Sequence, residues 1–481
     1  MHRRRVLSWA AAVQLGVLSF SVSPDALAAP PDRATPVPPS ASVPLIAAPL
    51  PAPIVENDDM LQPVPPAPHV VATWDEALAI LRARSTDLRI ALDEIEANDA
   101  RFRQTLAASL PNLTGSGNVT MNLLRDRPCF NGVCDSFVRP ALAQYGATIT
   151  LSQPLFAPRA WHANGTAKAA IEVARLSAED EKRTLTIALA SAVVSVVTSE
   201  RLSEINRVGL RAALDRLTLA RRRVALGAGN ALDVVRADQD VSVARSAVVS
   251  GDESLRQARE TLGLALGATD QWGVPPDINL NGVEASARSG CADVATLDDR
   301  ADIAAARGTM DIAKRNIDDA RLRFVPTVDL VSTFGLLSST SPTVTYASGL
   351  HESWTIAGVL TVPFYDGGAR YGALRENRAL ADEAAQRLEG ARRAASVQIT
   401  QARRAVEVAE QTRRVAESAR DLARETERLS RIAFQAGTGT SLDLIESGRR
   451  LREAEIQLAL QEFGLVRARI EALLSLARCR W

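Results

Sequence analysis

Four stretches of this chain alternate apolar and polar residues with a period of two, the pattern of a β-strand with one apolar and one polar face. They cover residues 112–123, 143–152, 327–336 and 353–362. Strands of roughly ten residues suit a tilted span of an outer membrane. Pro154 and Pro363 are predicted to end the second and fourth strands, because proline donates no hydrogen bond to a sheet.

A half-buried hairpin of a soluble sheet would show the same alternation. Two features favour a membrane. The helices predicted around the strands are too long for a compact α+β domain, and the polar rows of the first two strands contain no charged residue. An uncharged polar row is what a water-filled lumen requires.

Long helical stretches rich in Ala, Leu, Arg and Glu separate the strand pairs. After Trp161 no proline occurs until beyond Gly227, which predicts one helix of roughly 100 Å. A helical pattern starts at 73, and the longer predicted helices are about 87–108, 161–226, 230–266, 297–324 and 368–436, with a last helix that returns from the turn at 437–443 to about 477.

The two halves of the chain match in position. Gly227 corresponds to Gly437 and Asp233 to Asp443, each pair 210 residues apart. In the first turn Gly227 or Gly229 can take the positive φ of a helix C-cap, and Asn230 caps the returning helix. The sequence therefore predicts a duplicated unit of two strands and one long helical hairpin.

Composition agrees with long helices packed side by side, since aromatic residues make up only 4% of the 481 residues. The formal net charge is zero, which argues against nucleic acid as the main partner. Arginines at 3–5, an apolar run and a small-residue site at 26–28 predict a secretory signal peptide rather than an uncleaved anchor.

The predicted organisation has six parts. They are a signal peptide (1–28), a Pro/Ala-rich flexible arm (29–72), a first repeat (73–266), an irregular equatorial connector (267–296), a second repeat (297–477) and a C-terminal tail (478–481).

Four cysteines are the main candidates for covalent or metal chemistry. Cys129 and Cys134 share one short polar stretch with no histidine nearby, so a local disulfide is favoured over a metal site in an exported protein. Cys291 and Cys479 either pair with each other or stay free thiols. Histidines are scattered and acidic residues alternate with arginines on helix faces, so we expect no enzyme activity, metal or other cofactor.

In this order of elements the sequence resembles the TolC family of outer-membrane channel-tunnels over residues 73–477. The resemblance is carried by the strand exits at 153–156 (QPLF) and 362–368 (VPFYDGG) and by the turns ending in 232–234 (LDV) and 442–444 (LDL). It implies a homotrimer in which three chains of four strands close a twelve-stranded barrel in outer-membrane lipid. Long helical hairpins would form a periplasmic α-barrel.

The resemblance also implies site residues at the tip of that tunnel. Asp443 and Glu446 match the acidic constriction at the periplasmic entrance, where three chains would form two acidic rings. Acids near a helix N-terminus also simply offset the helix dipole, and both interpretations are compatible.

The family closes its tip with a Tyr and an Arg at positions held here by Phe434 and Gly439. Asp233, the acid they would meet, is present. We therefore expect a tip closed less by hydrogen bonds and more by apolar packing.

A periplasmic adaptor is expected to dock at the turns. Chain reversal needs about one glycine per turn, yet each turn carries two. The docking residues implied are Gly227, Gly229, Gly437 and Gly439.

The family serves type I protein secretion or tripartite efflux of small molecules. A missing lipid-attachment cysteine favours secretion, with an adaptor, an inner-membrane ABC transporter and an exported protein cargo as partners. The strongest resemblance within the family is to members that export an adenylate cyclase–haemolysin toxin. A soluble periplasmic coiled-coil scaffold is the rival interpretation, but it does not explain the four strands.

Overall fold

The computed structural model describes residues 58–121, 129–134, 143–275, 280–339, 349–479 and 481. The chain divides into two units, Met1–Ile54 and Val55–Trp481, and every described residue belongs to the second. The predicted signal peptide and most of the predicted arm lie outside the described residues.

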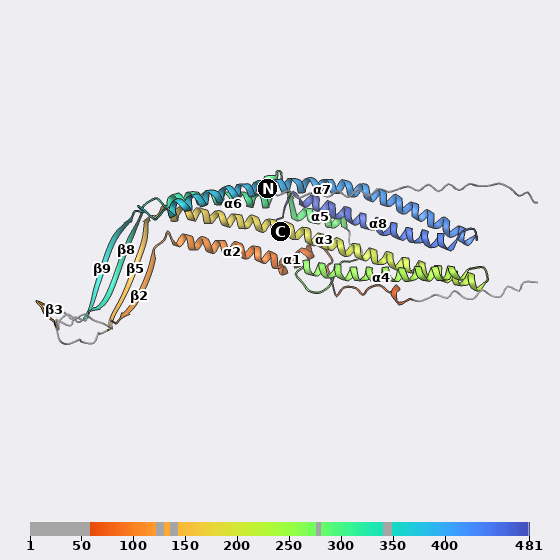
Figure 1. Ribbon diagram of the computed structural model, residues 1–481, viewed down its shortest axis with the longest axis horizontal. Coiled ribbons are helices and arrows are strands. Elements are labelled where there is room, and N and C mark those ends of the chain that lie inside the picture. Colours follow the sequence, from red (N-terminus) through yellow and green to blue (C-terminus); the bar gives the residue numbers. More distant parts are fainter. Residues whose placement is uncertain (1–57, 122–128, 135–142, 276–279, 340–348, 480) are drawn as a thin grey trace, which may run out of the picture. The chain divides into compact units, whose positions relative to one another are not determined.

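Four strands form one antiparallel sheet in the order β2-β5-β8-β9 (Figure 1). All four were predicted from the alternating pattern. Their bounds are β2 Asn112–Thr120, β5 Gln144–Phe156, β8 Thr327–Ser339 and β9 Gly349–Thr361.

One face of this sheet carries hydroxyl side chains. Thr114, Thr150, Thr333 and Thr355 are register partners across all four strands and form one threonine rung. In the next rung the hydroxyls of Ser116 and Thr148 share a hydrogen bond of 2.7 Å. Partners across a ladder point to the same face, so the alternate positions line the other face. There the chain leaves apolar side chains exposed: Leu113, Tyr145, Ile149, Leu151, Trp354, Ile356 and Leu360.

Pro154 does not end its strand, contrary to the prediction. β5 continues to Phe156, with a register shift between Pro154 and Phe156. The reason is that β2 pairs with β5 only as far as Ser152. Beyond that residue β5 has one partner strand, so the missing proline donor removes no bond on the β2 side. Pro363 follows the end of β9 as expected.

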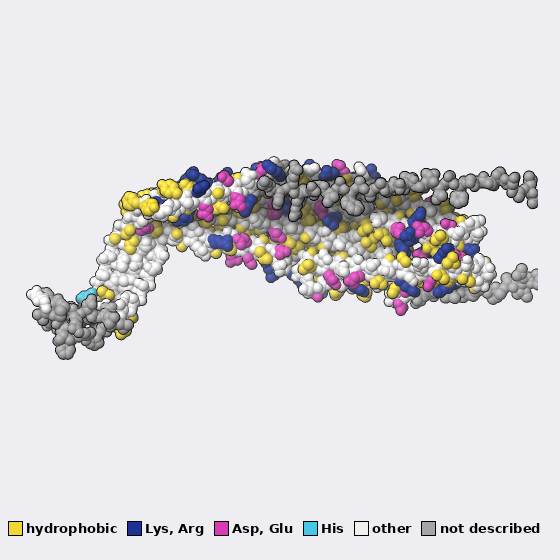
Figure 2. Space-filling view, viewed as in Figure 1, with side chains coloured by type: hydrophobic (Ala, Val, Ile, Leu, Met, Phe, Trp, Pro, Cys, Tyr) yellow, Lys and Arg dark blue, Asp and Glu magenta, His cyan; other side chains and the backbone are white. Residues whose placement is uncertain are grey.

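Two long antiparallel hairpins follow the strand pairs. α3 (Pro158–Ala225) packs against α4 (Ala231–Ala265), and α7 (Ala369–Gln435) packs against α8 (Ser441–Leu474) (Figure 1). α8 also packs against α3, which joins the hairpins. In Figure 2 charged side chains are spread over the helices and are sparse over the strands.

Shorter helices support the long ones. α2 packs against α3, and α6 packs against both α3 and α7. Ser85 separates α1 from α2 because its hydroxyl caps α2 by accepting the Leu88 amide. The bounds of these shorter helices are α1 Trp74–Arg84, α2 Thr86–Ala107 and α6 Ala301–Leu322, and there are also two single 3₁₀ turns, η1 Asp59–Leu61 and η2 Leu297–Asp299.

The largest buried core lies where the N-terminal helix, the connector and the C-terminus meet the long helices. Fully buried leucines come from α1, α3, α4 and α8: Leu81, Leu189, Leu262 and Leu474. The connector contributes more structure than predicted. It contains β6 Trp272–Gly273, α5 Leu280–Gly290 and β7 Cys291–Asp293, and the predicted tail begins in β10 Ala477–Cys479, which pairs with β7.

Residues 58–72 form an ordered strap on α3 and α4, although the sequence placed them in the flexible arm. β1 (His69–Val70) pairs with β6. The guanidinium of Arg245 binds Asp58 at 2.9 Å, and Arg259 donates to the carbonyl of Pro65 at 2.7 Å. A proline-rich segment outside a sheet leaves carbonyl oxygens unpaired, and Arg259, 194 residues away in the chain, supplies a donor to one of them.

Candidate functional site

The two turns between the long helices are built alike. Gly227 and Gly437 have φ values of +73° and +79°, a region that favours glycine. The amides that follow them, of Ala228 and Thr438, donate back to carbonyls in the last turn of each helix at 2.9 and 3.0 Å. These bonds satisfy helix-end carbonyls that would otherwise lack partners.

The second glycine of each turn has a steric explanation that the sequence did not provide. A Cβ at Gly229 would lie 2.9 Å from the backbone nitrogen of Val224, and one at Gly439 would lie 2.9 Å from that of Phe434. Both glycines of each turn are therefore required for chain reversal. The inference that a surplus glycine marks a docking site loses its support, and adaptor docking stays a proposal.

Caps at the starts of α4 and α8 place the acidic residues of the tip. The Asn230 side chain accepts the amide of Leu232 at 3.1 Å. At α8 the pair Thr440 and Asp443 forms a capping box, in which each side chain accepts a hydrogen bond from the other residue's backbone amide. Asp443 thus caps the helix in whose first turn it lies, a role that was not predicted from the sequence, and its place in an acidic constriction stays a proposal.

Two contacts join the first hairpin to the second at the tip. The Ser441 hydroxyl donates to the carboxylate of Asp233. The Arg223 guanidinium lies 4.4 Å from the centre of the buried Phe434 ring and donates to the Phe434 carbonyl at 3.3 Å. Two hydrogen bonds and a cation–π contact therefore connect the hairpins within the chain, and the expectation that this tip has fewer hydrogen bonds than those of its relatives stays a prediction.

Sequence reasoning missed Arg223 and Ser441 because it looked only at positions where the family carries Tyr and Arg. The sequence signal that could have identified these two residues is their distance along the chain from the turns. Arg223 lies four residues before the first turn glycine, and Ser441 is the first residue of α8.

Glu446 lies on the same helix as Asp443 and is paired with cations. Its carboxylate accepts hydrogen bonds from Arg449 at 2.9–3.1 Å and from Arg450 at 3.0 Å. The Arg449 guanidinium, with that of Arg450, holds the pKa of Glu446 below its usual value, so this residue is ionised.

Above the tip, a buried ion pair lies within the first hairpin. Arg216 of α3 donates to Asp240 of α4 at 2.6 and 3.2 Å, and the two side chains are only 12% and 5% exposed. Burial lowers the pKa of the nearby Arg452 on α8, although Asp240 opposes that effect.

Glycines let α3 and α8 approach each other at this ion pair. A Cβ at Gly448 would lie 2.8 Å from Nη1 of Arg216, and one at Gly209 would lie 2.6 Å from Cδ of Arg452. On each helix, a glycine therefore leaves the space that an arginine side chain of the other helix occupies.

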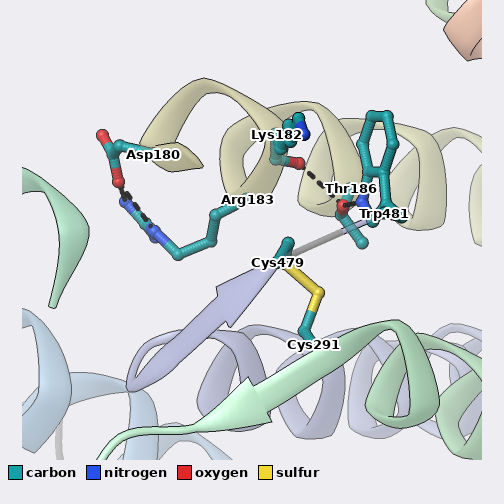
Figure 3. The surroundings of a disulfide bond; sticks show 7 residues. All are labelled: Asp180, Lys182, Arg183, Thr186, Cys291, Cys479 and Trp481. Carbon is teal, nitrogen blue, oxygen red and sulfur yellow. Dashed lines mark hydrogen bonds and ion pairs between the residues drawn. A yellow bond between two sulfur atoms is a disulfide. The ribbon is translucent and has the colours of Figure 1, made fainter. Parts of the chain in front are cut away.

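The four cysteines fall into two pairs. β3 (Cys129–Phe130) and β4 (Val133–Cys134) place Cys129 opposite Cys134, while the sulfur atoms lie outside the described part of the structure, so that disulfide stays a prediction. Cys291 and Cys479 are joined by a disulfide across β7 and β10, and both are buried (Figure 3).

Aromatic packing covers this second disulfide. The indole of Trp481 donates to the Thr186 hydroxyl at 2.9 Å, and that hydroxyl donates to the Lys182 carbonyl at 2.7 Å (Figure 3). Arg82 and Lys182 lie 5.1 and 5.7 Å from the centre of the indole ring. Cys479 and Trp481 of the predicted C-terminal tail thus belong to or pack against the core.

The sequence matches known proteins over most of its length. The model of the family "Outer membrane efflux protein" matches residues 77–268 and 294–476, which correspond to the two repeats. The alkaline protease secretion protein AprF of Pseudomonas aeruginosa is 22% identical over 67% of this chain and 68% of the relative. The fusaric acid resistance protein FusA of Burkholderia cepacia is 29% identical, but the match spans only 36% of this chain and 35% of the relative.

Solved structures show the same fold. The chain superposes on CusC with a TM-score of 0.72 at 18% identity, covering 86% of this chain and 97% of CusC. The outer membrane protein VceC from Vibrio cholerae gives 0.68 at 16% identity, covering 84% and 95%.

Members of the matched family are channels rather than enzymes, and TolC-like channels are trimers that work with adaptor proteins and inner-membrane transporters. The strands and hairpins described above supply the sheet and the tunnel helices of such a channel. Because the family model covers both repeats, the chain belongs to the outer membrane efflux protein family of TolC-like channels, which lie in the outer membrane with their helical tunnels in the periplasm.

Proposed function

We propose that the chain is the outer-membrane component of a type I secretion system. It would receive a polypeptide from an inner-membrane ABC transporter through a periplasmic adaptor. The observation that carries this proposal is the match to the alkaline protease secretion protein AprF, because it extends over two thirds of both chains.

The working unit is a homotrimer. In the described sheet β2 and β9 are edge strands, and open edges are not tolerated in lipid. Three copies of the four-stranded sheet close a barrel of twelve strands. The threonine rung would then become a ring of hydroxyls, which suits a polar lumen.

An apolar stripe on α7 supports the same assembly. Val408, Val415, Leu422 and Leu429 follow one another at intervals of seven residues and are 52–69% exposed in the single chain. A seven-residue apolar repeat packs against another helix in coiled-coil geometry. We assign this stripe to the seam with the next copy.

The hairpin tips form the periplasmic entrance and the adaptor site. The turns at Gly227–Gly229 and Gly437–Gly439 end both hairpins, and Asp233, Phe434 and Ser441 connect them. Asp443 and Glu446 would form the predicted charged rings at this entrance.

Efflux of small molecules is the alternative function. The match to FusA, a fusaric acid resistance protein, favours efflux, because its sequence identity is 29% compared with 22% for AprF. The FusA match spans about half as much of this chain as the AprF match. A finer proposal within secretion is that the cargo is an adenylate cyclase–haemolysin toxin, as the resemblance of the sequence implies.

A deletion strain separates these functions. Its secreted proteins and its susceptibility to dyes and drugs are compared with those of the parent and of the deletion strain carrying the gene on a plasmid. Loss of one large secreted protein with unchanged susceptibility supports type I secretion, and loss of haemolysis identifies the toxin cargo. Hypersusceptibility with secretion intact supports efflux instead.

A further inference from the structure

The first turns of α8 carry four charged side chains that sum to zero. Asp443 and Glu446 contribute two negative charges, and Arg449 and Arg450 contribute two positive charges. Both arginines donate to Glu446. The band is therefore electrically different from a pair of acidic rings.

These charges occupy the face of α8 that this chain leaves uncovered. Leu444 and Ser447 face the chain's own core, with 5% and 4% exposure. The side chains of Glu446, Arg449 and Arg450 are 35%, 47% and 67% exposed. Only a side chain that the chain's own packing leaves uncovered can meet a permeating ion.

The band is short enough to act as one electrostatic unit. Seven residues separate Asp443 from Arg450, which corresponds to about 10 Å of helix at 1.5 Å per residue. The Debye length is about 8 Å at physiological ionic strength. An ion midway along the band lies about 5 Å along the helix axis from either end, so the acids and the arginines both lie within one Debye length of it along that axis.

We propose that Arg449 and Arg450 determine the ion selectivity of the periplasmic entrance by cancelling the charge of Asp443 and Glu446. The entrance then admits anions as readily as cations. This inference rests on the proposed function, since it requires that three copies bring α8 to the entrance of a channel.

The test is the reversal potential of the full-length trimer in planar bilayers across a KCl gradient. The wild type is expected to show weak selectivity. Arg450→Ala leaves one uncompensated negative charge per chain, so the ratio of K⁺ to Cl⁻ permeability should rise several-fold, and Arg450→Lys should leave it unchanged. Adding Glu446→Gln to Arg450→Ala restores neutrality and should restore the wild-type ratio.

A matched control is Arg387→Ala. Arg387 is also an exposed arginine paired with a glutamate four residues earlier, but it lies on α7. Its replacement should not change the ratio. An unchanged ratio in Arg450→Ala channels that still conduct would overturn this inference alone. Wild-type protein that forms no channel would instead refute the proposed function.

Discussion

The ion pair between Arg216 and Asp240 can be tested by removing one partner. Asp240→Ala deletes the carboxylate that accepts two hydrogen bonds from the Arg216 guanidinium. The Arg216 guanidinium would remain between α3 and α4 without this acceptor.

The expected cost follows from burial. Breaking a buried pair by removing one partner costs about 3–5 kcal/mol. Because the Arg216 side chain is 12% exposed and reaches water at one edge, we expect about 3 kcal/mol. At about 1.4 kcal/mol per tenfold change, the folding equilibrium should fall roughly a hundredfold.

The assay is denaturant unfolding of the detergent-solubilised protein, followed by helical circular dichroism. Asp238→Ala is the matched control, because Asp238 is exposed on the same helix, and it should change stability by less than about 0.5 kcal/mol. The double variant Arg216→Met, Asp240→Leu should recover most of the loss, since an apolar pair needs no charge compensation.

Two results would refute this reasoning. The first is an Asp240→Ala variant no less stable than the Asp238→Ala control. The second is a double variant that is as unstable as Asp240→Ala alone, because the loss would then come from changed packing rather than from an unpaired guanidinium.

Three other substitutions have measurable expected outcomes. Gly209→Ala would place a methyl group 2.6 Å from Cδ of Arg452, so α3 and α8 should separate. The basal single-channel conductance should then rise, and an unchanged conductance would contradict this expectation. Burial alone would raise the pKa of Asp58, but its hydrogen bonds, including that from Arg245, bring this pKa below its usual value. The ion pair between Asp58 and Arg245 therefore stabilises the strap above about pH 4, and this stabilisation is lost as the pH falls through the lowered pKa. Asp58→Ala should expose residues 58–72 to protease at pH 7. Burial and two neighbouring carboxylates raise the pKa of Glu181, so its ionised form weakens the fold above that pKa, and Glu181→Gln should raise the melting temperature at pH 7 but not at pH 3.

The regular elements could be predicted because each depends on local pattern. Period-two alternation located β2, β5, β8 and β9, and the absence of proline after Trp161 located α3. Pro154 was misjudged because its effect depends on how many strands flank it, and the sequence does not state where β2 begins to pair.

The parts that failed depend on contacts between distant residues. The strap at 58–72 has little helix or strand pattern of its own and is held by Arg245 and Arg259. Sequence likewise predicted Asp233 at the tip but not its partner Ser441, which lies 208 residues away. The pairing of Cys291 with Cys479 was left open for the same reason.

The disulfide between Cys291 and Cys479 turns the second repeat into a covalent ring. The two cysteines are 188 residues apart, so the ring encloses both strands β8 and β9 and the whole second hairpin. Closing a loop of this length removes enough disorder from the unfolded chain to stabilise the fold by about 5 kcal/mol. Because Cys479 follows both repeats in the chain, the ring closes only after the second repeat has reached an oxidising compartment. A chain that stops within the second hairpin would lack Cys479 and could not form the ring, so this bond also reports whether the second hairpin has been completed.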